Sequence, residues 1–319
     1  MKNIVSLVIT IILALAFMVC GFIGGVDLTP LQQETLNILI IVCLSAVTYC
    51  FIVGEISRNN SQMDKLWSIL PIAYTWITMF KSGFNIRVVL MTIVVTLWGI
   101  RLTYNFAKKG AYSIKFWEGE EDYRWRILRS KKPFTNKFVW GIFDLLFISF
   151  WQNVVVLGIC LPAVAVMSSD APIGVIDILS VSFGALFLLY EIIADHQQNT
   201  FQVKKYQLLN EGKKLEELDE PYSRGFNVKG LWKFSRHPNY LGEQGIWVSL
   251  YFLVVNAGVA HWGVFNWSSI GAVLLILIFA GSSRMAETIS CKKYKEYPEY
   301  QKQVHKYLPI RGYKVKQKI

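Results

Sequence analysis

The chain has 319 residues, of which 53% are apolar, and a formal net charge of +11. Several runs of about 20 residues carry no charge, which is the length needed to cross the ~30 Å hydrocarbon core of a bilayer. A soluble enzyme is excluded, and an integral membrane protein is predicted.

The positive charge is confined to particular loops, so membrane orientation explains it and no nucleic-acid partner is expected. The five cysteines and four histidines are scattered through the sequence, so neither a disulfide framework nor a metal site is expected.

The hydropathy pattern predicts an all-α, polytopic helical bundle of about eight spans, within a range of seven to ten. The first is interpreted as a retained helix, not a cleaved signal, because its apolar stretch is long. The third is the least secure, being short and containing Pro71. No soluble domain interrupts residues 1–319, so one membrane domain is expected, with N-terminal helices in 1–83. The expected spans are 4–26, 34–54, 66–82, 86–107, 138–167, 173–194, 241–259 and 267–285.

The distribution of Lys and Arg predicts the orientation. Residues 108–137, 195–240 and the tail after the last span are rich in both, whereas 25–33, 168–172 and 260–266 contain neither. With eight spans and both termini in the cytoplasm, every loop obeys the positive-inside rule except the short Lys81–Arg87 turn.

The segment Gly230–Glu243 joins a basic loop to an apolar helix. Pro238 is suited to the first helical position, where its missing N–H costs nothing. Arg236 and His237 would then flank a helix N-terminus, which favours anions. Asn239 and Glu243 are four residues apart and share a helix face. A ligand site is favoured over the alternative, a juxtamembrane basic anchor with a satisfied histidine.

Gly242 and Gly245, in the same helix, would let a ligand or another helix approach the backbone closely.

Further polar residues fall on the same predicted side of the membrane. Glu191 and Asp195 share a face at the end of the sixth span, where like charges oppose each other and the helix dipole. This double cost predicts a function over a solvated helix end. Arg284 and Glu287, three residues apart at the inner end of the eighth span, either pair with each other or serve a site.

For two polar patches nearer the N-terminus, a functional and a structural interpretation are about equally favoured. Asp64 is a candidate functional acid or simply a cap of the third span. Arg101 and Tyr104 share a face near the inner end of the fourth span, and Arg101 either serves a site or snorkels to the interface.

Tyr294 and Tyr297 are suited to hold an adenine or to form an interfacial belt.

The motif Ser235-Arg236-His237-Pro238-Asn239-Tyr240, followed by Gly242-Glu243, resembles the signature of the steroid 5-alpha-reductase-like membrane superfamily. The nearest resemblance is to its bacterial DUF1295 branch. Tyr294-Lys295-Glu296-Tyr297-Pro298 is similar to the C-terminal pattern of the same superfamily. The resemblance covers about Leu97 to Pro309, within a catalytic region expected over 86–319. It implies an inner-membrane protein whose active site faces the cytoplasm.

The resemblance also implies a function: NADPH-dependent reduction of a C=C bond in a lipid, isoprenoid or steroid-like substrate. An S-adenosylmethionine-dependent lipid or isoprenoid methyltransferase is the alternative, because this superfamily includes isoprenylcysteine carboxyl methyltransferases. A non-catalytic lipid-binding protein is a third interpretation. The expected partners are membrane lipids and a hydrophobic small molecule, with no obligate protein partner. The residues expected around the cofactor are Arg101, Glu191, Asp195, Arg236, His237, Asn239, Tyr240, Glu243, Arg284, Glu287, Tyr294 and Tyr297.

The sequence departs from the steroid enzymes at the Glu and Tyr that polarise a 3-keto group. Ile69 and Trp98 occupy the corresponding places, and neither side chain can exchange the required proton. A 3-keto steroid substrate is therefore not expected, and Asp64 and Tyr104 are the candidate catalytic residues for proton transfer.

Overall fold

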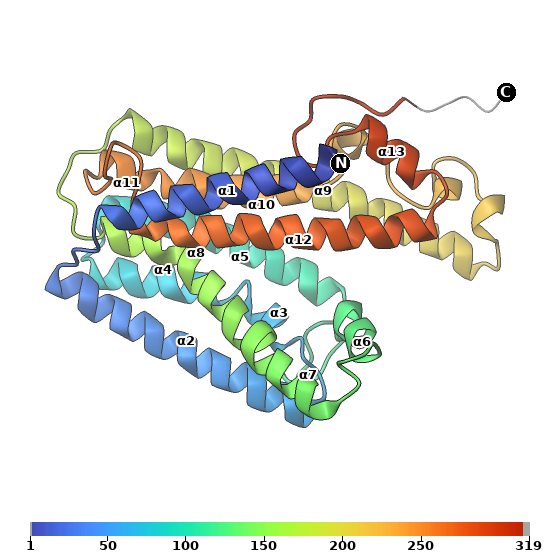
Figure 1. Ribbon diagram of the computed structural model, residues 1–319, viewed down its shortest axis with the longest axis horizontal. Helices are drawn as coiled ribbons and strands as arrows, with labels where there is room; N and C mark the ends of the chain where they lie inside the picture. The colour runs from blue at the N-terminus through green and yellow to red at the C-terminus, as the bar shows by residue number, and fades with distance from the viewer. Residues whose placement is uncertain (1, 315–319) are drawn as a thin grey trace. The chain divides into compact units, whose positions relative to one another are not determined.

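The computed structural model describes the backbone of residues 2–314 and the side chains of residues 12–314. Over that part of the chain every regular element is helical, apart from two isolated bridges (Figure 1). The expected all-α class is confirmed. The elements are α1 (Lys2–Ile23), α2 (Pro30–Ser57), α3 (Gln62–Leu66), α4 (Leu70–Lys81), α5 (Ile86–Lys108), α6 (Tyr123–Arg129), α7 (Lys137–Phe143), η1 (Asp144–Trp151), α8 (Gln152–Val166), α9 (Val175–Asn210), η2 (Leu215–Glu217), η3 (Tyr222–Arg224), η4 (Gly230–Lys233), α10 (Pro238–Tyr251), α11 (Leu253–Asn256), η5 (Trp267–Ser269), α12 (Ile270–Lys293) and α13 (Tyr297–Gln303).

Each of the eight ranges expected to span the membrane contains a helix, but their lengths differ. Five helical segments in the described residues are long and apolar enough to cross a membrane. They are Pro30–Ser57, Ile86–Lys108, Lys137–Val166, Val175–Asn210 and Trp267–Lys293. By contrast, α4 has 12 residues, about 18 Å at ~1.5 Å per residue, with Pro71 in its first turn. The eight-span count and the cytoplasmic termini remain predictions.

The chain divides into two compact units, each with its own packing. Unit 1 comprises Met1–Val181 and Ser249–Leu275, and unit 2 comprises Ser182–Val248 and Ile276–Ile319. The helices α9, α10 and α12 each contribute residues to both units.

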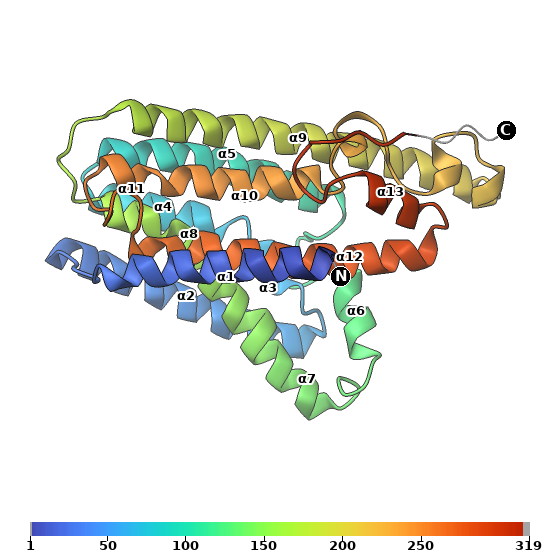
Figure 2. The same ribbon diagram turned by 45° about the horizontal axis from the view of Figure 1, so that its top comes forward.

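Unit 1 packs α4 against α5 and α8, and α2 against α8 and η1 (Figure 2). α8 and α12 cross at two glycines, because a Cβ atom at Gly271 would lie 1.9 Å from the carbonyl carbon of Gly158. Such contact between backbones requires glycine at both positions.

The Lys81–Arg87 turn, the exception to the positive-inside rule, has both its charges paired inside unit 1. Lys81 contacts Glu34 at 2.6 Å. Arg87 is fully buried and forms a two-bond ion pair with the equally buried Asp177, at 2.9 and 3.0 Å. Both cations of the turn therefore have an acidic partner within unit 1.

Candidate functional site

The central motif and the C-terminal segment, the two most specific pieces of the resemblance, lie side by side in unit 2. Ser235 forms a parallel bridge with His305. The backbone N–H groups of Arg236 and His237 donate to the carbonyls of His305 and Lys306, at 3.0 and 2.9 Å. Residues more than 60 positions apart therefore form one framework that holds the start of α10, which begins at Pro238 as predicted.

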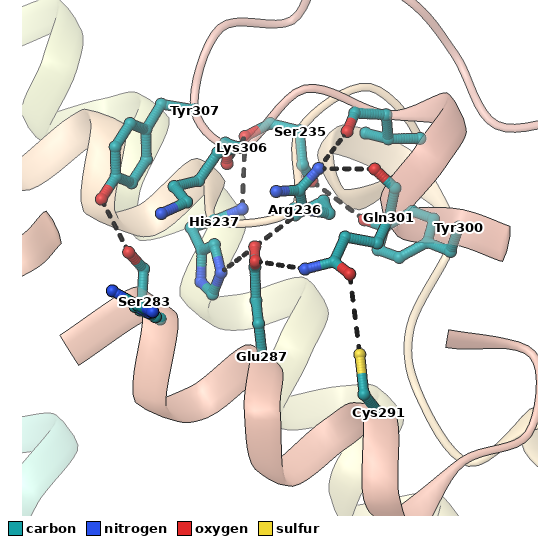
Figure 3. A network of polar contacts seen from close by, with 12 residues as sticks. Ser235, Arg236, His237, Ser283, Glu287, Cys291, Tyr300, Gln301, Lys306 and Tyr307 are labelled. Atoms are coloured by element: carbon teal, nitrogen blue, oxygen red, sulfur yellow. Dashed lines mark hydrogen bonds and ion pairs between the residues drawn. The ribbon is translucent and has the colours of Figure 1, made fainter. Parts of the chain in front are cut away.

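Glu287 is the centre of a buried polar network (Figure 3). Arg236 donates from Nε to Glu287 at 2.7 Å and from Nη1 to the carbonyl oxygens of Gln301 and Val304. Gln301 donates to the other carboxylate oxygen at 2.7 Å. Arg236 and Glu287 are only 7% and 5% exposed, so the Arg236 charge is balanced within the protein. Glu287 pairs with Arg236, and its alternative partner in the sequence, Arg284, is exposed.

His237 completes this network as a neutral ring. Burial lowers the pKa of His237 below its ordinary value, and the hydrogen bond to Glu287 opposes that shift. The neutral imidazole donates from Nε2 to Glu287 at 3.0 Å, leaving Nδ1 as an acceptor. Tyr240 stacks on the ring with 5.1 Å between centroids. The expected anion site at Arg236 and His237 is thus occupied by a protein carboxylate.

Two cations lie beside the network. Lys306 is half-buried and Arg284 is exposed. Burial lowers the pKa of Lys306, Glu287 opposes the shift, and Arg236 and Arg284 add to it. This mutual repulsion means that several positive charges share a small region, where an anionic ligand would be stabilised.

Carboxylates lie where α9 and α10 pack together in unit 2. A Cβ atom at Gly242 would lie 2.6 Å from Cβ of Glu191, and one at Gly245 would lie 2.4 Å from the ring of Phe187. The two glycines therefore serve helix packing, the second of the uses expected for them. Glu243 is 5% exposed and accepts a hydrogen bond from Trp247 at 2.9 Å.

Asp195 and Asn239 meet at this same packing surface. Asn239 donates from Nδ2 to Asp195 at 3.2 Å. Its other amide atom, Oδ1, is buried and has no hydrogen-bond partner among the described residues. The hydroxyl of Tyr190 and Oε1 of Gln198, both on α9, are in the same condition. Buried polar atoms are rarely left without partners, so this region is suited to a polar ligand.

Tyr294 and Tyr297 belong to a mainly aromatic core cluster. Tyr297 is 6% exposed and packs edge-on against Phe226 at 4.9 Å. Tyr294 packs against the same ring at 5.8 Å. Neither an adenine site nor an interfacial belt is needed to explain these two rings.

The remaining predicted residues belong to unit 1. Asp64 is buried, accepts from Nε1 of Trp125 at 2.9 Å and lies 3.8 Å from Arg124. Burial raises the pKa of Asp64, and Arg124 opposes the shift. The helix of the expected third span, α4, has Ile69 at its N-cap, and Asp64 lies inside α3, whose N-cap is Ser61, so the capping alternative is wrong.

Tyr104 and Arg101 lie on α5 in different surroundings. Tyr104 is 57% exposed and has the Lys108 ammonium 4.3 Å from its ring centroid. Arg101 is half-buried. Trp98, expected in place of a catalytic tyrosine, is completely buried.

No group of three or more potential metal-ligating side chains occurs in the part of the chain that the structure describes. Sequence reasoning missed Lys306 and Gln301 as members of the site. Both lie in the basic tail that resembles the superfamily, but nothing in their spacing indicates which network they join.

These observations define a protein whose described residues are helical, with five helical segments long and apolar enough to cross a membrane and a polar site in unit 2. Residues 50–306 match the family described as "Protein of unknown function (DUF1295)", and the chain belongs to that family. A Schizosaccharomyces pombe relative, "Uncharacterized protein C594.04c", is 33% identical over 288 residues, covering 81% of this chain and 77% of the relative. No solved structure matches significantly.

Proposed function

We propose that this protein is a membrane-embedded, NADPH-dependent reductase of a C=C bond in a lipid, isoprenoid or steroid-like molecule, with its site open to the cytoplasm. The observation that carries the proposal is the buried Oδ1 of Asn239, without a partner beside Asp195. A carboxamide oxygen in this state is suited to accept from the amide N–H of a nicotinamide or from a ribose hydroxyl.

The charges of unit 2 support a dinucleotide in two ways. Asp195, Glu191 and Glu243 provide carboxylates, which bind ribose hydroxyls well. Lys306 and Arg284 provide further cations, and among the described residues neither forms an ion pair with Glu287 as Arg236 does. We assign the phosphate contacts to Lys306 and Arg284, while Arg236 and His237 hold the frame of the site.

When bound, the cofactor would supply a hydride, and the protein would supply orientation, exclusion of water and a proton. Asp64, in unit 1, is the first of the two proton donors predicted from the sequence, and burial raises its pKa, which favours the protonated acid. The proposal for the cofactor in unit 2 does not depend on it. Tyr104 is the second candidate.

The acidic character of α9 and α10 favours one alternative. Glu191, Asp195 and Glu243 with the ring of Tyr240 would also suit the sulfonium and amino groups of S-adenosylmethionine. Under this alternative the protein is a lipid or isoprenoid methyltransferase.

Cofactor binding to the purified full-length protein, measured by titration calorimetry, separates the two. We expect NADPH to bind more tightly than NADH. Lys306→Ala should weaken NADPH by about tenfold, since a charge-assisted phosphate contact is worth ~1.5–3 kcal/mol.

Lys302→Ala is the matched control, because Lys302 is an exposed cation on α13 whose nearest acid is Glu299 at 3.8 Å. It should leave NADPH affinity unchanged. Tight binding of S-adenosylmethionine with no response to NADPH would reject the reductase and favour the methyltransferase.

A further inference from the structure

Unit 1 contains a buried carboxyl group that the proposed function does not use. Asp144 is 1% exposed and lies in the segment Lys137–Val166, one of those long enough to cross the membrane. Its hydrogen-bond partners among the described residues are neutral: Asn60 at 2.8 Å and the hydroxyl of Ser149 at 3.3 Å. Ionisable side chains at membrane depth are costly and usually serve a function.

The backbone at Asp144 is also irregular. Residues Asp144–Trp151 form a π-helix between α7 and α8. A π-helical turn is rare and is frequently found at functional sites. Asp144 and Ser149 belong to this irregular stretch, and Asn153 lies just after it, in the first turn of α8.

Asn153 provides the second, independent observation. It is completely buried and donates from Nδ2 to the carbonyl of Ser149 at 2.7 Å. Its Oδ1 has no hydrogen-bond partner in the described part of the chain. Because Ser149 also donates to Asp144, the unpartnered oxygen and the carboxyl belong to one connected polar cluster.

This cluster consists mainly of acceptors. Asp144 has two carboxyl oxygens, each with further acceptor capacity, and Asn153 has one unused carbonyl oxygen. A ligand that satisfies them must donate hydrogen bonds. A hydroxyl or an ammonium group does so, whereas a ketone, ester or ether does not.

An apolar groove beside the segment that carries Asp144 indicates that the ligand also has an apolar part. An open groove of about 520 Å³ is lined by Phe51 of α2 and by residues of the α7–η1 segment. Those residues are Lys137, Phe138, Gly141, Ile142 and Leu145. Gly141 and Leu145 flank Asp144 in the chain, and Phe51 lies between Cys50 and Gly54, which approach Asn153 and Asp144 respectively.

We infer that unit 1 binds an amphiphile whose hydrogen-bond-donating head, a hydroxyl or an ammonium, is held by Asp144 and Asn153 and whose apolar tail occupies this groove. This site belongs to unit 1 alone and does not depend on which cofactor unit 2 binds.

The test uses the purified full-length protein in detergent without nucleotide. Three probes share one C20 isoprenoid chain: the primary alcohol, the primary amine and the methyl ether of the alcohol. We expect the alcohol, the amine or both to bind at least about tenfold more tightly than the ether, a difference of ~1.4 kcal/mol. Preference between alcohol and amine distinguishes the two kinds of head.

Asn153→Leu separates a binding role from a structural one. It keeps a similar volume and removes the unpartnered oxygen together with the hydrogen bond to the Ser149 carbonyl, two opposing effects. The ligand-free protein should therefore keep a melting temperature close to that of the wild type, while head-group binding falls at least about tenfold. Thr92→Val is the control, since the equally buried hydroxyl of Thr92 is satisfied by the carbonyls of Val88 and Thr75. It should not change probe binding.

Three results would overturn the inference. The ether could bind as tightly as the alcohol and amine. A second such result would be that none of the three probes binds at concentrations up to its solubility limit. Asn153→Leu could lower the melting temperature while leaving binding intact, which would make Asn153 a structural residue. All three leave the reductase proposal untouched, because no nucleotide is present.

Discussion

The polar cluster around Arg87 and Asp177 in unit 1 and the pair of Asn239 and Asp195 in unit 2 differ in how many of their polar atoms have hydrogen-bond partners. In unit 1, Arg87 and Asp177 are both fully buried, and Asp177 also accepts from the backbone of Gly174 and from Asn256. Arg87 adds hydrogen bonds to the carbonyls of Ala171 and Pro172. In unit 2, Asn239 makes one long hydrogen bond to Asp195 and leaves its oxygen unpartnered.

This difference separates polar residues that hold a fold from polar residues that receive a ligand. A network that is completed within the protein gains nothing from a further partner, whereas an incomplete one is stabilised by it. Arg236 and Glu287 fall into the first kind, although the resemblance indicated the second.

The strongest way to break this comparison is Arg87→Leu. It would leave Asp177 buried without its cation, and removal of one partner from a buried pair costs about 3–5 kcal/mol. We expect loss of monodisperse protein in fluorescence-detected size-exclusion chromatography after mild heating. The double variant Arg87→Leu/Asp177→Leu should recover part of the loss. If Arg87→Leu were as stable as the wild type, the Arg87–Asp177 ion pair would not stabilise unit 1 as proposed.

Gly242→Ala tests the helix contact that carries the unit 2 carboxylates. Overpacking against the backbone of α9 should lower the free energy of unfolding by ~1–3 kcal/mol. Gly281→Ala is the control in the same unit, because a Cβ there meets no atom within 4 Å. It should be neutral or stabilising by about 0.5–1 kcal/mol. Equal melting temperatures for the two variants would argue against close packing at Gly242.

A matched pair of asparagines sharpens the comparison. Asn256→Leu removes a donor from buried Asp177 and should cost ~1–3 kcal/mol of stability. Asn239→Leu removes an unpartnered oxygen and one long hydrogen bond to Asp195, which is only partly buried, so its cost should be smaller, below about 1 kcal/mol. Cofactor affinity should respond in the opposite order, falling at least about tenfold only in Asn239→Leu. Thermal unfolding and calorimetric titration of both variants measure the two effects.

The smallest expected effect concerns pH. Burial places the pKa of His237 in the folded protein below the ordinary value of about 6.5. The unfolded chain therefore binds more protons just below pH 6.5, and stability falls as the pH falls through that window towards the folded pKa. His237→Gln should show a flatter decline between pH 7.5 and 5.5 than the wild type. An identical slope would show that His237 does not titrate in this way.

The sequence predicts the helices well and the networks poorly. Hydropathy locates every apolar helix, and Pro238 marks the start of α10 because a proline at that position favours a helix start. The partner of Arg236, however, lies 51 residues away, and that of Arg87 lies 90 residues away. No local period specifies such pairs.

Other features could not be predicted because no local sequence pattern specifies them. The π-helix at Asp144 follows no hydrophobic repeat that distinguishes it from an α-helix. Lys306 is one of many cations in the tail, and only the backbone pairing of its segment with Arg236 and His237 brings it to the site. Asp195 and Asn239 were expected around one cofactor, but the sequence did not predict their direct contact.

The pairing of Arg87 with Asp177 also affects when native contacts can form during synthesis of the protein. The partner of Lys81, Glu34, is translated before it, but Asp177 is translated 90 residues after Arg87. Until then, the start of α5 holds a cation without its counter-ion, so the α4–α5 hairpin cannot complete its native contacts. We expect nascent chains halted before residue 177 to be degraded faster than chains halted well beyond it, which pulse-chase labelling of arrested chains measures.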